Sequence, residues 1–126
     1  MTEFRYQPGQ VWSYKDAPRP DSRAIVGKVE NIAGTGWVVS VCVTNVYLPN
    51  WQTREPELNA ISHAPMTAEA MDSSVVAQTG TGEPIDGFAE SYSEWRALFG
   101  KNEAGVFIIT VADVVKFIGE AIAKGQ

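Results

Sequence analysis

The chain has 126 residues and a formal net charge of −5, with 44% hydrophobic and 20% charged residues. This length favours a single domain over residues 1–126 with its own core, and the composition excludes a chain that is disordered throughout. Because Cys42 is the only cysteine, an intramolecular disulfide and a cysteine-rich metal site are excluded as well.

The first half of the chain predicts β-strands. Three segments are rich in β-branched and aromatic residues and are separated by turn signals. They cover residues 10–15, 23–30 and 37–46. The odd positions of the third segment form one apolar face, and its even positions are mixed. Short connections between neighbouring strands favour a bent antiparallel sheet, and a small, partly closed barrel is the alternative.

Residues 47–65 carry the weakest pattern, because three prolines interrupt them. A structureless loop of this length is unusual in a small domain, so we expect a fourth strand near residues 58–63. Thr67 is a suitable N-cap for a helix over residues 68–78, and residues 80–84 form a flexible connection after it. The predicted buried side of this helix carries Ala70, Met71, Ser74 and Val75.

The second half predicts helices. An aromatic helix begins after Asp86, its predicted N-cap, and should pack its rings on the sheet. These rings fall at i, i+4, i+7 and i+11, namely Phe88, Tyr92, Trp95 and Phe99. Residues 106–109 predict a strand that joins the sheet edge, and Thr110 starts a last amphipathic helix. The predicted fold class is therefore α+β, with a bent antiparallel sheet from the N-terminal half packed by two to three helices from the C-terminal half.

Several segments together carry a resemblance. Residues 9–14 (GQVWSY), 28–30 (KVE), 92–96 (YSEWR) and 103–107 (EAGVF), with a closing helix, resemble a family of small uncharacterised bacterial cytoplasmic proteins. The resemblance spans most of the chain except residues 47–85. It implies a bacterial cytoplasmic domain and no particular chemistry.

The expected location follows from two absences in the sequence. No apolar run approaches the roughly 20 residues that span a bilayer. The first residues also lack the apolar segment of a secretory signal. We therefore expect a cytoplasmic protein that does not enter a membrane.

No residue pattern names a reaction. His63, the only histidine, and Cys42 are candidates for a thiol–imidazole pair, but Cys42 lies among valines, where a small buried hydrophobic residue is expected. Gly34–Gly36 and Gly80–Gly82 lack the features of phosphate-binding loops and are interpreted as turns. We therefore expect no catalytic residue, no bound metal, no cofactor and no enzymatic activity.

The charge distribution indicates a binding surface instead. Residues 67–126 carry the whole net charge, with nine acidic against four basic residues. Asp86, Glu90 and Glu94 are spaced four apart, so they are predicted to line one helix face, and Glu83 lies nearby. We call these four residues the acidic ridge. An acidic surface attracts basic partners and repels phosphate backbones, and a merely solvated face is the alternative interpretation.

We accordingly expect a non-catalytic binding protein, of a protein-binding or toxin-immunity type, whose acidic ridge contacts a basic partner. Trp51 joins this predicted site because it stands in a polar loop, and exposed aromatics favour interfaces. The alternative is a small-ligand or single-stranded nucleic-acid binder that uses Trp12, Tyr14 and Trp37 among basic residues. The acidic helical half disfavours nucleic acid, and the oligomeric state is not predicted.

Overall fold

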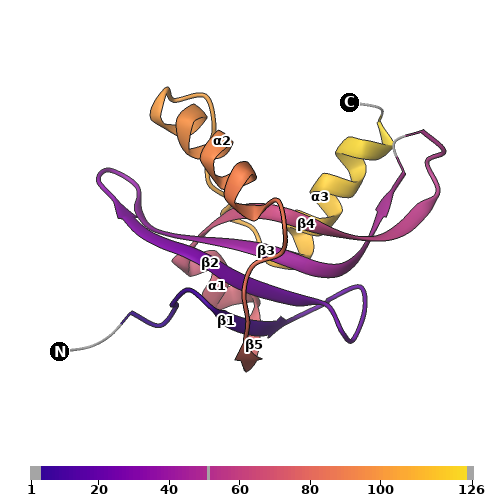
Figure 1. Ribbon diagram of the computed structural model, residues 1–126, viewed down its shortest axis with the longest axis horizontal. Helices are drawn as coiled ribbons and strands as arrows, with labels where there is room; N and C mark the ends of the chain where they lie inside the picture. The colour runs from indigo at the N-terminus through magenta and orange to yellow at the C-terminus, as the bar shows by residue number, and fades with distance from the viewer. Residues whose placement is uncertain (1–3, 51, 125–126) are drawn as a thin grey trace.

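The structure, a computed structural model, describes residues 4–50 and 52–124. Within these residues the chain forms a five-stranded antiparallel sheet packed with three helices, so the α+β prediction is confirmed (Figure 1). The strands are β1 (Gln10–Tyr14), β2 (Arg23–Ile32), β3 (Gly36–Pro49), β4 (Pro56–Thr67) and β5 (Val75–Thr81). The helices are α1 (Ala68–Ser74), α2 (Phe88–Gly100) and α3 (Val111–Ala123). No helix in the described part of the chain is long and apolar enough to cross a membrane.

The strand order is β4-β3-β2-β1-β5. The first four strands are each paired with their neighbour in sequence, and the predicted fourth strand is present within the longer β4. β5 breaks this order, because α1 carries the chain from β4 at one edge to β1 at the other, where β5 pairs antiparallel. The edge strands β4 and β5 do not pair with each other, so the sheet is not closed into a barrel.

The main core lies between one face of the sheet, α1 and α3. Trp12 and Tyr14 point into it from β1, and Met71 and Val114 meet them from the helices. The strand residues of this core are Trp12, Tyr14, Ala24, Val26, Val39, Val41, Val43, Val46, Leu48, Ile61, Ala64, Met66 and Val75. Each fully buried valine or methionine among them contributes roughly 1.5–3 kcal/mol. The period-two alternation of the strands therefore selects this face as the interior.

The opposite face of the sheet is also covered, by α2. On β3 the even-numbered Val38, Ser40 and Cys42 are buried as completely as their odd-numbered neighbours. In Figure 1 the segment that leads into α2 crosses the near face of the sheet, with α1 and α3 behind it. The middle of β3 is thus buried on both faces, although its even positions looked mixed in sequence.

A bulge in β4 directs two consecutive side chains toward α2. The pairing register shifts between Val41 and Val43 of β3. As a result, Ser62 and His63 of β4 both lie opposite Cys42. The Ser62 hydroxyl lies 2.8 Å from that of Ser91 on α2. The His63 ring contacts the Phe88 ring, with centroids 5.6 Å apart.

The helix predicted over residues 68–78 is too long. It ends at Ser74, and the following residues form β5 instead. Val75 and Val76 are β-branched and favour a strand, and the free edge of β1 supplies hydrogen-bond partners. The four residues predicted on its buried side are nevertheless buried. Thr67 caps the helix as predicted, because its Oγ1 accepts a hydrogen bond from the backbone N of Ala70 at 3.1 Å.

The edge strand predicted at residues 106–109 is reduced to a single bridge. Phe107 pairs with Met66 in parallel, and its neighbours are not in a strand. The backbone N of Phe107 donates to the carbonyl of Pro65 at 2.8 Å. The carbonyl of Phe107 accepts from the backbone N of Thr67 at 3.0 Å. This short contact nevertheless ties the helical half to β4.

The N-cap predicted at Asp86 is wrong. Gly87 occupies the cap position with a φ of 93°, and no side chain caps the helix. The chain enters α2 through this left-handed residue, which glycine adopts without strain. The predicted start of the last helix is confirmed, because Thr110 Oγ1 accepts from the backbone N of Asp113 at 3.2 Å.

Candidate functional site

α2 presents two different sides. On the sheet side, Phe88 and Trp95 are buried and Tyr92 and Phe99 are half-buried, as their spacing predicts. Gly27 on β2 makes room for this packing, because a Cβ atom there would lie 2.3 Å from Phe88 Cζ. The rings therefore hold α2 on the sheet and leave its other side to solvent.

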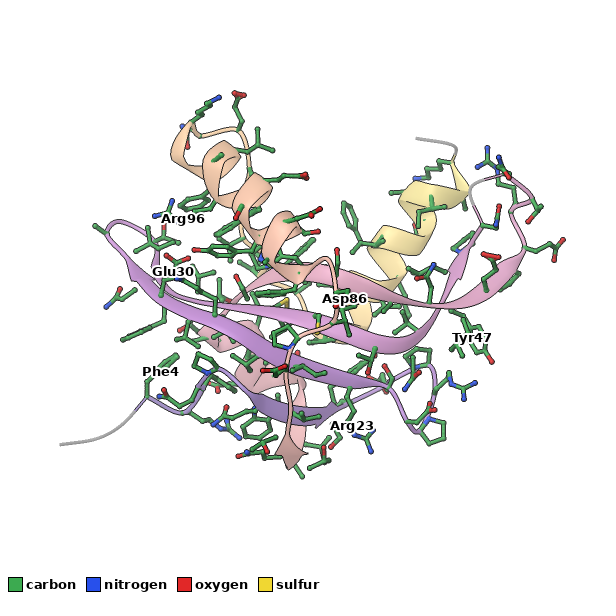
Figure 2. All side chains as sticks on the ribbon, in the orientation of Figure 1. Phe4, Arg23, Glu30, Tyr47, Asp86 and Arg96 are labelled. Carbon is green, nitrogen blue, oxygen red and sulfur yellow. The ribbon has the colours of Figure 1, made fainter. Side chains whose placement is uncertain are left out.

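The acidic ridge lies on this solvent side, although its members do not all belong to the helix. Glu90 and Glu94 are exposed on α2 opposite the rings. Glu83 and Asp86 are also exposed, but the helix begins at Phe88, so the prediction that Asp86 shares the helix face is wrong. Figure 2 shows Asp86 at the end of α2 that lies nearest the sheet.

The acidic ridge has no partner among residues 4–50 and 52–124. Among the described residues, no hydrogen bond or ion pair joins any of its four side chains to another group. Arg96, the base within α2, points away from the ridge and lies 3.5 Å from the carboxylate of Glu30 on β2 (Figure 2). Glu30 also accepts a hydrogen bond from Tyr92. Burial and this bond raise the pKa of Tyr92 to about 12, so the phenol stays a neutral donor.

The contact of Glu30 with Tyr92 and Arg96 was not predicted from sequence. It joins residues more than 60 positions apart, which no local spacing rule connects. Trp51, the remaining residue of the predicted binding site, lies outside the described residues.

His63 sits among the rings that α2 lays on the sheet. Its ring centroid is 5.4–5.7 Å from those of Phe88, Tyr92 and Trp95. Its Nε2 lies 2.9 Å from Oγ of the buried Ser40. Burial lowers the pKa of His63 to about 4, so the imidazole is neutral near pH 7.

Cys42 and His63 do not form a thiol–imidazole pair among the described residues, because the imidazole bonds to Ser40 instead. The Cys42 thiol is buried, and burial raises its pKa. An activated cysteine needs the opposite shift. Within residues 4–50 and 52–124, no group of three or more His, Cys, Asp or Glu side chains is placed to hold a metal ion.

The aromatic residues of the alternative hypothesis are divided between the core and the surface. Trp12 and Tyr14 are buried in the main core. Trp37 is 41% exposed, but it stacks on Phe4 with ring centroids 4.3 Å apart. These rings therefore do not form one continuous stacking surface.

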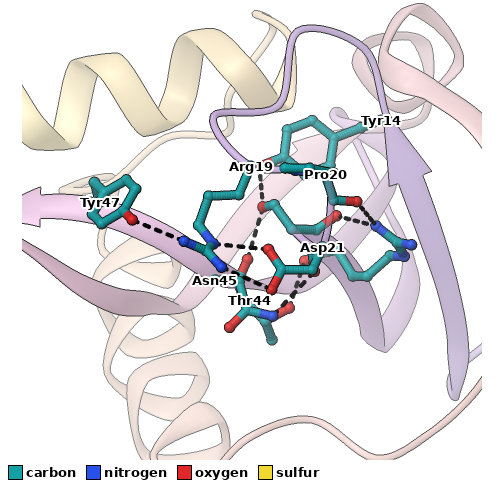
Figure 3. A network of polar contacts seen from close by, with 9 residues as sticks. Tyr14, Arg19, Pro20, Asp21, Thr44, Asn45 and Tyr47 are labelled. Atoms are coloured by element: carbon teal, nitrogen blue, oxygen red, sulfur yellow. Dashed lines mark hydrogen bonds and ion pairs between the residues drawn. The ribbon is translucent and has the colours of Figure 1, made fainter.

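Of the basic residues near these rings, Lys15, Arg19, Arg23 and Lys28, the last three contact other groups of the protein. Arg19 donates to the carboxylate of Asp21 and to the hydroxyl of Tyr47, both at 2.8 Å (Figure 3). Arg23 donates to two backbone carbonyls of the β1–β2 loop, those of Pro20 and Ser22, both at 2.8 Å. Lys28 lies over the Tyr92 ring, 5.5 Å from its centroid. Arg19 thus connects the β1–β2 loop to β3, and Arg23 connects the same loop to β2.

Comparisons of the chain with protein-family models, with curated proteins and with solved structures found no match.

Proposed function

We propose that this protein is a non-catalytic cytoplasmic binding module, of a protein-binding or toxin-immunity type, that captures a basic protein partner on its acidic ridge. The supporting observation is a set of exposed carboxylates that have no cationic partner within the described chain. The buried rings of Phe88 and Trp95 hold the backbone of α2 in place. The two ridge residues on α2, Glu90 and Glu94, therefore stand on a fixed backbone, which lowers the entropy cost of binding.

The chemistry of the partner follows from the charge. Glu90 and Glu94 repel each other, which costs a helix roughly 0.2–0.5 kcal/mol. A partner surface rich in Lys and Arg removes this repulsion and adds attraction. Complementary charge of this kind mainly raises the association rate, and it weakens as salt increases.

The test reverses the charge of the ridge and of a matched control. The ridge variant is Glu90→Lys/Glu94→Lys, and the control is Glu55→Lys/Glu57→Lys, which changes two exposed acids at the start of β4. Wild type and both variants are immobilised and incubated with native lysate at about 50 and about 300 mM salt. We expect the ridge variant to lose at least about tenfold of the basic proteins that wild type and control retain at low salt. Equal recovery by all three proteins, with the same salt dependence, would show that the ridge is irrelevant.

A further inference from the structure

The connection between α2 and α3 crosses the edge of the sheet. We call residues 105–109 the apolar strap. At one end, Trp95 Nε1 on α2 donates to the carbonyl of Gly105 at 2.8 Å. In the middle, Phe107 bonds to the β4 backbone at Pro65 and Thr67. These contacts hold the strap in place as it passes from the face covered by α2 to the face covered by α3.

The strap and its surroundings expose large apolar side chains. Ile108 is 79% exposed, Phe117 on α3 is 57% exposed and Leu98 on α2 is 43% exposed. Phe117 joins the strap through an edge contact with Phe107, at 5.9 Å between centroids. A hollow of about 230 Å³ lies beside them, lined by Gly105, Val106 and Phe107. Exposed apolar groups gathered in this way on a fixed backbone are typical of an interaction surface.

Leu98 links the strap to the acidic ridge. Ser91 contacts Ser62 on β4, whereas Arg96 contacts Glu30 on β2. One flank of α2 therefore faces β4, and the other faces β2. Leu98 follows Ser91 by seven residues, or two helical turns, and therefore lies on the β4 flank, where the strap crosses.

Carboxylates frame the apolar side chains. Glu94 precedes Leu98 by one helical turn, and the backbone N of Glu103 bonds to the Leu98 carbonyl at 2.8 Å. On α3, Asp113 and Glu120 lie one turn before and after Phe117. All four acids are exposed, and in the described chain their side chains make no hydrogen bond or ion pair.

This arrangement distinguishes between occupants. A second copy of the chain would bring the same carboxylates face to face around a shared apolar patch, and such repulsion opposes self-association. A segment with apolar side chains on one side and Lys or Arg beside them satisfies both the apolar groups and the acids. We propose that the strap and its hollow bind a basic amphipathic segment of a partner protein. The inference rests on the proposed function and places its apolar anchor at the strap.

The probe for this proposal is a fluorescein-labelled synthetic peptide of about 18 residues, patterned from leucine and lysine as an amphipathic helix. A lysine–serine peptide has the same charge without the apolar side, and a leucine–glutamate peptide has the opposite charge. Binding is measured by fluorescence anisotropy. We expect the leucine–lysine peptide to bind at least about tenfold more tightly than either control peptide.

Variants locate the binding site. Ile108→Ser/Phe117→Ser should weaken the leucine–lysine peptide at least about tenfold. The control Leu58→Ser/Val76→Ser changes two apolar residues of similar exposure on β4 and β5, and it should change affinity by less than about twofold. Circular dichroism checks that each variant is folded. All four side chains are exposed, so we expect both variants to fold.

Three outcomes would overturn the proposal. One is equal binding by the strap variant and wild type, and another is equal binding of the lysine–serine and leucine–lysine peptides. In either case, a loss of lysate partners by Glu90→Lys/Glu94→Lys alone would leave the ridge function standing. The third is a wild-type dimer, seen by sedimentation, that Ile108→Ser/Phe117→Ser abolishes, because the occupant is then a second copy.

Discussion

Acidification should destabilise this protein through one side chain, that of His63. It is the only histidine, and burial lowers its pKa from 6.5 to about 4. Between these two values the unfolded chain binds a proton that the folded chain does not bind. The stabilisation is therefore complete above about pH 6.5 and is lost as the pH falls toward 4.

The magnitude follows from the size of this difference. A pKa difference from 6.5 to about 4 corresponds to at most about 3 kcal/mol. His63 keeps part of its surface exposed, so solvent screening reduces this figure. We expect the free energy of unfolding to fall by about 1–2 kcal/mol between pH 7.5 and pH 5. The neighbouring charges are Lys28, which opposes protonation, and Glu30, which favours it; each contacts the Tyr92 ring or hydroxyl.

The assay is urea unfolding, followed by tryptophan fluorescence, at about pH 7.5, 6 and 5. Wild type is compared with His63→Gln, in which the amide can still bond to Ser40 but cannot titrate. The carboxylates are common to both proteins, so their contribution cancels in the difference. We expect the variant to be less stable at high pH and to lose less stability on acidification. Parallel pH profiles for the two proteins would refute the assignment of a low pKa to a buried His63.

Two further predictions concern packing and capping. Gly27→Ala places a Cβ atom 2.3 Å from Phe88 Cζ and should lower the free energy of unfolding by about 1–3 kcal/mol. Gly100→Ala, where nothing lies within 4 Å, should not, and equal urea midpoints for the two variants would mean that α2 does not rest on β2 as described. Thr110→Ala removes the acceptor for the backbone N of Asp113 and should cost about 1 kcal/mol in thermal or urea unfolding, most of which Thr110→Ser should retain. An unchanged Thr110→Ala protein would indicate that water replaces the cap.

Local sequence patterns predicted the parts of this fold that depend only on residues close together in the chain. The apolar odd positions of residues 37–46 and the ring spacing in α2 are readable from neighbours in sequence, whereas the burial of the even positions of β3 under α2 is not. Thr67 and Thr110 cap their helices through bonds only three residues long. Residues 75–78 of β5 were assigned to a helix because their pairing depends on the free edge of β1, which lies more than 60 residues away.

The candidate site shows the same division. The exposure of Glu90 and Glu94 follows from their position opposite the rings. Asp86, in contrast, was placed on the helix because Gly87 was not recognised as the N-cap of α2. The bulge that turns His63 toward α2 depends on strand register, which no local pattern in residues 47–65 reveals. The apolar residues of the strap were assigned to a strand because a short apolar run is typical of one, whereas in the fold Ile108 and Ile109 are exposed.

The length of α1 has a geometric consequence for the whole sheet. This helix of seven residues joins β4 to β5 without any intervening loop, since Thr67 ends one strand and Val75 begins the other. A helix of that length spans about 10 Å. In a flat sheet of the same strand order, the edges β4 and β5 would stand about 19 Å apart, because four inter-strand steps separate them. A flat sheet could not be connected in this way, so α1 acts as a tether whose length limits how far the sheet can open. The curvature that encloses the core is set by this short span as well as by the valines that fill it.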